Sequence, residues 1–165
     1  VTLPSGQPGE IELSGITCTP GYWQKPDANA ATFVDQRWMK SGDIGYIDDD
    51  GFLHITGRIK EIVIRGGENI YPGEIESAAF GMDEVHECVV FGEPDDAMGE
   101  ELVMVIFITP GHSLQEQDLR DFLGDRIAGY KVPRTIRVAK TPLPRNASEK
   151  LHKLKVKEAY LAGAY

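Results

Sequence analysis

Residues 57–76 read GRIKEIVIRGGENIYPGEIE, and the pattern of the chain changes across this stretch. The apolar run at residues 61–64 predicts a short strand, which the adjacent glycines Gly66 and Gly67 interrupt. Pro72 predicts the start of a helix, because the N–H that proline lacks would have no partner in the first helical turn. The stretch therefore marks a boundary between two parts of the chain that are organised differently.

The part before this boundary is rich in strands and turns. Residues 43–47 and 52–56 predict two short strands, and the Asp-Asp-Asp-Gly sequence between them favours a tight hairpin because Asp and Gly tolerate positive φ angles. Residues 10–16 alternate polar and apolar positions, as a half-buried strand does. No helix of ordinary length is predicted before residue 72. Residues 1–58 are therefore expected to be a strand-rich piece whose packing partners are missing.

The part after the boundary alternates strands with helices. Strands are predicted at residues 61–64, 85–91, 102–108 and 135–139, and helices from Pro72, between Ser113 and Gly129, and after Ser148 as N-cap. This order predicts an α+β fold. Residues 59–165 would form a small domain in which a short mixed sheet is flanked by helices.

The composition narrows the class of protein. Hydrophobic residues make up 41% of the 165 residues and charged residues 26%, values typical of a chain that folds around a core in water. The net charge of −9 argues against general nucleic-acid binding, although residues 140–165 carry six basic and two acidic residues. No apolar run approaches the ~20 residues needed to span a bilayer. Cys18 and Cys88 form no disulfide framework or metal knuckle, so a reducing cytoplasm is expected.

Several common catalytic signatures are absent from the sequence. It has no Gly-x-x-x-x-Gly-Lys-Ser/Thr phosphate loop, no Gly-x-Gly-x-x-Gly, no His-Glu-x-x-His and no Gly-x-Ser-x-Gly. The four histidines show no metal-ligand spacing, so no metal site is predicted within this chain.

Three local patterns carry candidate chemistry, each with a simpler alternative that the residues alone leave open. Asp43, on a turn before a strand, can accept hydrogen bonds from a ribose diol or can serve the turn itself. Arg58 can bind ribose or phosphate oxygens, or can form a surface salt bridge. Gly66 and Gly67 let a ligand approach the backbone, or they are a plain connector from strand to helix.

A fourth pattern surrounds Lys150. If Ser148 caps a helix, Lys150 lies in its first turn, where the helix dipole disfavours a cation unless the side chain points outward at an anion. This position distinguishes Lys150 from the other lysines of the tail, whose presence needs no explanation beyond solubility. Those lysines are Lys153, Lys155 and Lys157.

Taken together and in order, six motifs resemble the adenylate-forming enzymes, the superfamily of acyl- and aryl-CoA synthetases, peptide adenylation domains and firefly luciferase. The motifs cover nearly the whole chain, and the wording Gly-Gly-Glu-Asn-Ile-Tyr-Pro is most similar to that of the fatty-acyl-CoA ligases. They are Gly21-Tyr-Trp23, Ser41-Gly-Asp43-Ile-Gly-Tyr46, Asp50-Gly-Phe52, Gly57-Arg58-Ile-Lys60-Glu61, Gly66-Gly67-Glu-Asn-Ile-Tyr-Pro72-Gly-Glu74-Ile-Glu76 and Pro144-Arg145-Asn-Ala-Ser-Glu-Lys150.

The resemblance implies a two-step reaction with ATP, Mg²⁺ and coenzyme A. A small-molecule carboxylic acid would attack the α-phosphate of ATP to give acyl-AMP, and the thiol of coenzyme A would then displace AMP. It also implies roles for matching residues. Lys150 would be catalytic in adenylation, Asp43 and Arg58 would bind the nucleotide, Lys60 would be the hinge, and Gly66 and Gly67 would line the path of the CoA thiol.

Two departures from the family's pattern matter. Glu149 stands where the family usually has glycine, and the phosphate-binding loop, acyl pocket and Mg²⁺-linked motif of the family, which belong upstream, have no match here. We therefore expect residues 1–58 to be the end of a large N-terminal domain and residues 59–165 to be the mobile C-terminal domain. The isolated chain is expected to be inactive. It is also expected to have no membrane-spanning segment.

Two other functions remain open at this stage. One is an adenylation domain that loads a carrier protein, and the other is a non-catalytic binding domain. The sequence does not identify the acid or the oligomeric state.

Overall fold

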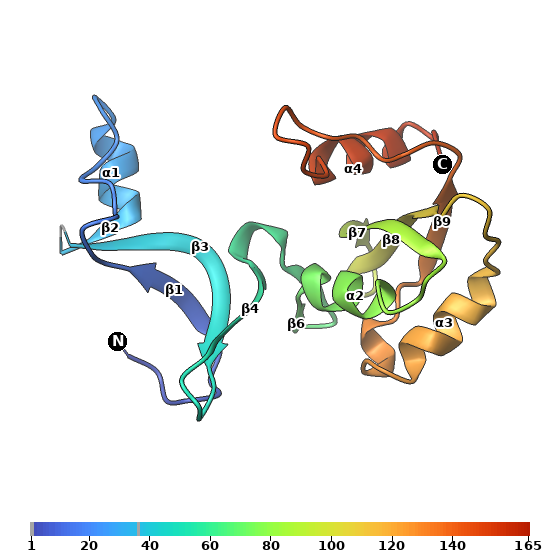
Figure 1. Ribbon diagram of the computed structural model, residues 1–165, viewed down its shortest axis with the longest axis horizontal. Helices are drawn as coiled ribbons and strands as arrows, with labels where there is room; N and C mark the ends of the chain where they lie inside the picture. The colour runs from blue at the N-terminus through green and yellow to red at the C-terminus, as the bar shows by residue number, and fades with distance from the viewer. Residues whose placement is uncertain (1, 36) are drawn as a thin grey trace. The chain divides into compact units, whose positions relative to one another are not determined.

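The computed structural model describes residues 2–35 and 37–165. The chain divides into two compact units at residues 1–60 and 61–165, each with its own sheet (Figure 1). The assignment of the first unit to the end of a larger N-terminal domain stays a prediction.

Unit 1 is built on a four-stranded antiparallel sheet around its longest strand, β3, which pairs with all three others. A single seven-residue helix and a 3₁₀ turn complete the secondary structure in the described part of this unit. The elements are β1 (Gly9–Leu13), α1 (Pro26–Thr32), β2 (Phe33–Val34), β3 (Trp38–Ile47), β4 (Leu53–Arg58) and η1 (Ile59–Glu61), whose last residue already belongs to unit 2.

The predicted hairpin between β3 and β4 is confirmed. Asp48 organises its turn, because Oδ1 accepts hydrogen bonds from the N–H groups of Asp50 (3.0 Å) and Phe52 (2.8 Å), and Gly51 takes the positive φ of +86° that the turn needs. Helix α1 lies in the part of the chain where no helix of ordinary length was predicted. Pro26 occupies its first turn, where proline is tolerated.

Unit 2 contains a five-stranded mixed sheet in the order β6-β5-β8-β7, with β9 pairing β8 in parallel and every other pair antiparallel. This confirms the predicted α+β class with a short mixed sheet flanked by helices. The elements are β5 (Val63–Arg65), β6 (Glu68–Ile70), α2 (Pro72–Ala79), β7 (Val85–Asp95), β8 (Gly99–Ile108), α3 (Glu116–Gly124), η2 (Gly129–Lys131), β9 (Thr135–Ala139) and α4 (Lys153–Leu161).

Helices cover both faces of this sheet (Figure 1). On one face, Ile75 of α2 and Leu119 of α3 pack against Met104 of β8. On the other face, Val156 of α4 packs against Val103 of β8 and against Val89 and Phe91 of β7. Strand β8 is therefore apolar on both sides over most of its length, which explains its apolar sequence at residues 102–108.

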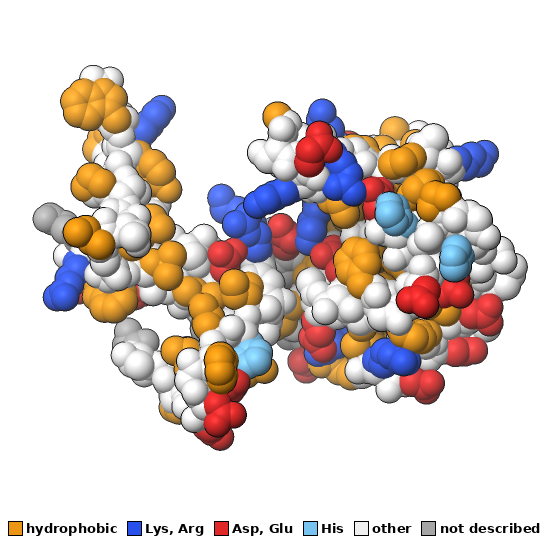
Figure 2. Space-filling view, viewed as in Figure 1, with side chains coloured by type: hydrophobic (Ala, Val, Ile, Leu, Met, Phe, Trp, Pro, Cys, Tyr) orange, Lys and Arg blue, Asp and Glu red, His pale blue; other side chains and the backbone are white. Residues whose placement is uncertain are grey.

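Charge is divided between these helices. Helix α3 carries acidic residues in its first turn, and Figure 2 shows acidic side chains gathered over it, whereas basic side chains lie over the region of α4. No helix in the described part of the chain has the length and apolar character needed to cross a membrane.

Three predicted boundaries were wrong. Strand β7 continues to Asp95 instead of ending at residue 91, and the chain reverses after Asp95, whose Oδ1 accepts hydrogen bonds from the N–H groups of Ala97 and Met98. Helix α3 starts after Gln115 without a side-chain cap, so the predicted Ser113 capping box does not form. Helix α3 also ends at Gly124, earlier than predicted.

Candidate functional site

In unit 1, the two predicted nucleotide-binding residues face each other across the β3–β4 hairpin. The register pairs Asp43 with Arg58, and Nε of Arg58 donates to Oδ1 of Asp43 at 2.8 Å. The N–H of Asp43 donates to Oγ of Ser41 at 3.0 Å. Both residues lie within β3, where its pairing with β1 is irregular, so the prediction that Asp43 lies on a turn before the strand was wrong. The salt bridge that sequence reasoning kept as the simpler alternative for Arg58 is therefore present, and its partner is the other candidate.

A β-bulge makes this pairing possible. Ile44 pairs with Gly57 and Gly45 pairs with Ile55, so Thr56 is the extra residue of β4. The Thr56 hydroxyl donates to the Ile44 carbonyl oxygen at 3.1 Å and holds the bulge. Without the extra residue, the register would place Gly57 opposite Asp43.

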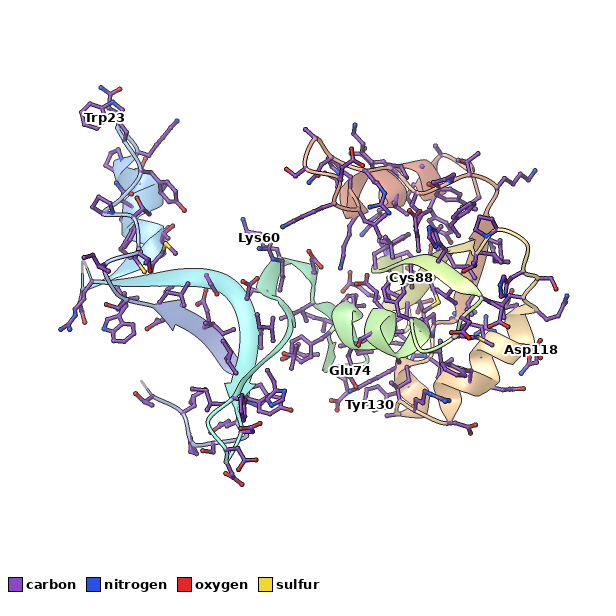
Figure 3. All side chains as sticks on the ribbon, in the orientation of Figure 1. Trp23, Lys60, Glu74, Cys88, Asp118 and Tyr130 are labelled. Carbon is purple, nitrogen blue, oxygen red and sulfur yellow. The ribbon has the colours of Figure 1, made fainter. Side chains whose placement is uncertain are left out.

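Lys60, the predicted hinge, lies exposed in the 3₁₀ turn η1 at the end of unit 1 (Figure 3). Its role as a hinge stays a prediction.

In unit 2, Gly66 and Gly67 form the two-residue turn of the β5–β6 hairpin. Their φ angles of +58° and +86° are those of the primed turns that join twisted strands. They therefore connect strand to strand, with helix α2 starting after β6. A side chain at Gly66 would come within 2.7 Å of Cε of Met98, whereas the space around Gly67 is open for 4 Å. The exposed backbone of Gly67 can be approached closely by a ligand.

Lys150 lies at the end of a small hairpin loop. Asn146 closes the loop: its N–H donates to the Lys150 carbonyl oxygen at 2.9 Å, and its Oδ1 accepts from the N–H of Lys150 at 3.0 Å. Among the described residues, Lys150 takes part in no salt bridge, and its side chain is exposed. The loop thus fixes the backbone of Lys150 and leaves its ammonium group available.

The predicted helical position of Lys150 was wrong. Helix α4 begins at Lys153, and its N-cap is His152, whose Nδ1 accepts from the N–H of Lys155 at 3.3 Å. The N–H of Ser148 instead donates to Oδ1 of Asn146, so Ser148 belongs to the loop. The argument from the helix dipole therefore does not apply to Lys150.

Residues 74–150 match the protein family described as AMP-binding enzyme C-terminal domain. The chain is 43% identical over 152 residues to a 2-succinylbenzoate–CoA ligase of Listeria monocytogenes, covering 92% of this chain and 32% of that protein. It is 38% identical over 154 residues to the long-chain-fatty-acid–CoA ligase FadD13 of Mycobacterium tuberculosis, covering 93% of this chain and 30% of that protein.

The chain is therefore similar to the C-terminal portion of adenylate-forming CoA ligases. It matches the C-terminal portion of these enzymes, and it spans about a third of the length of the relatives named above.

A solved adenylate-forming enzyme has the same fold over this length. The o-succinylbenzoate CoA synthetase MenE of Bacillus subtilis, in complex with its acyl-adenylate intermediate, matches with a TM-score of 0.86 and 35% identity, covering 94% of this chain and 31% of that one. The same synthetase has also been solved with ATP and a magnesium ion.

Glu149 occupies a loop position that requires an unusual backbone conformation. Residues 147–149 form a three-residue hairpin loop, and Glu149, its last residue, has a φ of +61°. This loop type requires a left-handed residue at that place, which glycine adopts most easily. The turn therefore suits the glycine that the resemblance to the family implies at this position.

Two tail lysines do more than the sequence indicated. Nζ of Lys153 contacts Oε2 of Glu61 at 2.7 Å and Oε2 of Glu76 at 2.9 Å, and Nζ of Lys157 donates to the Gly92 carbonyl oxygen at 2.6 Å. Burial opposes the charge on Lys153, but the attraction of Glu76 and Glu61 outweighs it, so the pKa of Lys153 is raised. The expectation that these lysines serve only solubility was wrong, because their carboxylate and carbonyl partners are distant in sequence.

Other reactive groups of unit 2 do not form a second site. Cys88 lies inside the sheet (Figure 3), and burial raises the pKa of its thiol well above the usual range, so the thiolate nucleophile is disfavoured. Residues 2–35 and 37–165 contain no group of three His, Cys, Asp or Glu side chains that could hold a metal ion.

Sequence reasoning missed the support beneath the Lys150 loop. Oε1 of Glu87, in β7, accepts from Nη2 of Arg145 at 2.5 Å, and Oε2 accepts from the N–H of Leu143 at 2.6 Å. The available signal was a carboxylate in the strand sequence at residues 85–91, which is apolar apart from Glu87 and His86, since a buried charge needs a partner.

Proposed function

We propose that the protein carrying this chain is an ATP-dependent acid–thiol ligase, an acyl-CoA synthetase. The carboxylate oxygen of the acid bonds to the α-phosphorus of ATP as pyrophosphate leaves. The thiol sulfur of coenzyme A then bonds to the acyl carbon as AMP leaves and the thiol proton is lost. The observation that carries the proposal is the exposed side chain of Lys150 on a braced loop, in a chain that aligns with CoA ligases over more than nine-tenths of its length.

Lys150 acts in the first step. Its ammonium group lies next to the carboxylate and α-phosphate oxygens, where negative charge accumulates, and stabilises that charge more in the transition state than in the bound substrates. A point charge on a flexible stem suits this role, since it needs no planar geometry from its partner.

Asp43 and Arg58 hold the nucleotide. The Asp43 carboxylate has acceptor positions beyond the one that Arg58 occupies, so it can accept hydrogen bonds from the ribose hydroxyls while Arg58 orients it. Arg58, which is largely exposed, keeps further N–H donors for ribose or phosphate oxygens.

Gly66 and Gly67 act in the second step, where the open backbone of their turn lets the pantetheine arm approach. Lys60 is the hinge about which unit 2 turns between the two steps. The cytoplasm, where ATP and coenzyme A are both available, is the proposed location.

The chain does not suffice for catalysis. It spans about a third of the length of the CoA ligases that it matches, and the ligands of Mg²⁺ and the acyl pocket come from the part of those enzymes that this chain does not cover. Exposed apolar side chains of unit 1, among them Trp23 and Phe52, support a packing partner of that kind.

The identity of the acid lies outside this chain. The relatives are named for acids as different as 2-succinylbenzoate and a long-chain fatty acid, at similar identity to this chain, so a role in fatty acid metabolism is one case among several. Because these relatives are named CoA ligases, we favour coenzyme A, not a carrier protein, as the source of the thiol.

The test is a product analysis with the intact protein, ATP, Mg²⁺, coenzyme A and a panel of aromatic and aliphatic acids. We expect AMP, pyrophosphate and one thioester in equal amounts from the accepted acid, and no turnover from the 165-residue chain alone. ADP and phosphate as products would contradict adenylation, and turnover by the chain alone would contradict its dependence on a second domain.

A further inference from the structure

Glu87 is a buried carboxylate that serves the Lys150 loop. It lies in β7 with a side chain that is 4% exposed, and both its oxygens accept hydrogen bonds from the segment leading to Lys150. One donor is the N–H of Leu143 and the other is the guanidinium group of Arg145. A buried carboxylate is costly unless it is paired, so these two contacts hold the start of the loop firmly on the sheet.

Arg145 carries this constraint to the lysine. Its Nη2 binds Glu87, and its Nη1 donates to the carbonyl oxygen of Glu149 at 2.6 Å. That carbonyl belongs to the peptide bond whose nitrogen is that of Lys150. Arg145 also pairs with Leu151 in a β-bridge, so the guanidinium group and the backbone of one residue brace both sides of Lys150.

The brace matters because Lys150 lies on a loop. A misplacement of about 1 Å at a reacting centre can cost about 100-fold in rate. If the backbone of Lys150 were mobile, its flexible side chain would have to lose conformational entropy to place the ammonium group at the reacting atoms. The contacts of Glu87 remove this freedom before substrate binds.

We propose that Glu87, acting through Arg145, is a positioning residue for Lys150, and that it sets the rate of acyl-adenylate formation without touching the substrate. This inference rests on the proposed function and adds a requirement to it. The thioester-forming step does not use Lys150, so it should not depend on Glu87.

The test compares Glu87→Gln with a matched variant, Glu101→Gln, in the intact ligase. The amide that replaces the Glu87 carboxylate offers one acceptor oxygen to two donors, so one contact is lost while size is kept. Glu101 is similarly buried and pairs with a guanidinium group, that of Arg65 at 2.9 Å, but it does not contact the loop. Both variants break a buried ion pair, and only one of these pairs holds Lys150.

Rates of the two half-reactions are measured separately in single turnovers. We expect Glu87→Gln to lower acyl-adenylate formation about 10- to 100-fold and to leave thioester formation from supplied acyl-adenylate within about 3-fold. Glu101→Gln should leave adenylation within about 3-fold. Equal loss of both half-reactions in Glu87→Gln, unchanged adenylation, or the same adenylation loss in Glu101→Gln would each overturn the inference.

Two further measurements keep the result interpretable. In the 165-residue chain, Glu87→Gln should speed amide hydrogen exchange at Leu143 and Lys150; unchanged exchange at both would overturn the bracing role even if the intact variant fails to fold. Lys150→Ala serves as the reference for activity. If Lys150→Ala loses adenylation and Glu87→Gln does not, positioning by Glu87 is wrong and the proposed function stands. If Lys150→Ala keeps adenylation, the role of Lys150 is wrong, and positioning by Glu87 is wrong with it.

Discussion

Replacing Glu149 by glycine should stabilise unit 2, because the loop holds this residue at a φ of +61°. The conformation is fixed from both sides: the N–H of Glu149 donates to the Asn146 carbonyl oxygen at 3.0 Å, and its own carbonyl oxygen accepts from Arg145. A residue with a Cβ costs about 1–2 kcal/mol in the left-handed region. Glycine avoids this cost but loses about 0.5–1 kcal/mol through its freer unfolded chain.

The net expectation for Glu149→Gly is a gain of about 0.75 kcal/mol in the free energy of unfolding of unit 2, the difference between the midpoints of the two ranges. Glu149→Ala provides the matched control, since it removes the carboxylate and keeps the Cβ. It should change the free energy of unfolding by less than about 0.5 kcal/mol, as an ordinary surface substitution does. Glu149→Asn should fall between them, because Asn tolerates the left-handed region better than other residues with a side chain.

The assay is denaturant unfolding of the 165-residue chain, with two signals. Amide hydrogen exchange at the buried Val105 of β8 reports unit 2, while tryptophan fluorescence reports unit 1, since Trp23 and Trp38 are the two tryptophans of the chain. Only the first signal should respond to Glu149→Gly. A gain from Glu149→Ala as large as that from Glu149→Gly would refute the backbone explanation and implicate the charge, and no gain from either would refute strain at this position.

Further predictions concern the packing of both units. Lys153→Met should lower the free energy of unfolding of unit 2 by about 1–3 kcal/mol, since it leaves the carboxylates of Glu61 and Glu76 without their partner. The control Lys155→Met removes an exposed lysine and should cost less than about 0.5 kcal/mol. Equal effects of the two substitutions would contradict a stabilising role for the Lys153 ion pairs. Because the pKa of Lys153 is raised on folding, its contribution should be complete below about pH 10.4 and should disappear as the pH rises through the raised value, so unfolding curves of wild type and Lys153→Met should converge only in strong alkali. Gly67→Ala should cost about 1 kcal/mol through its φ of +86° alone, because no atom of the described residues lies within 4 Å of the new Cβ, and a cost above about 3 kcal/mol would indicate a contact that the structure lacks. Gly45→Ala should lower the stability of unit 1 by about 1–3 kcal/mol, seen in the tryptophan transition, because the new Cβ would overlap the carbonyl oxygen of His54; an unshifted transition would contradict the close approach of β3 and β4.

Local sequence signals predicted the parts of the fold that short-range chemistry decides. The Asp-Asp-Asp-Gly turn, the Gly66–Gly67 break and the start of α2 at Pro72 all depend on residues adjacent in sequence, and all three are present. The strand Thr135–Ala139 was also predicted with the correct bounds. These features need no knowledge of distant contacts.

Two wrong predictions concern the segment around the start of α4, and one missed feature depends on long-range contacts. Ser148 was interpreted as a helix cap, but Asn146 competes for the same backbone N–H groups and forms a hairpin loop instead. The last helix was predicted directly after Ser148, but α4 starts at Lys153, so that it buries Val156 and leaves Leu154 61% exposed. The bracing of Lys150 by Glu87 joins positions more than fifty residues apart, and no local pattern reports such a pairing.

The central claim is that Lys150 supplies the charge that permits adenylation in an acid–thiol ligase. The most direct measurement is the rate of each half-reaction in the intact ligase with Lys150→Ala, beside Lys155→Ala, which removes an exposed charge five residues along the chain. The account predicts that Lys150→Ala slows acyl-adenylate formation at least about 100-fold, leaves thioester formation from supplied acyl-adenylate within about 3-fold, and that Lys155→Ala changes neither. Adenylation at the wild-type rate in Lys150→Ala, or equal loss of both half-reactions, would contradict it.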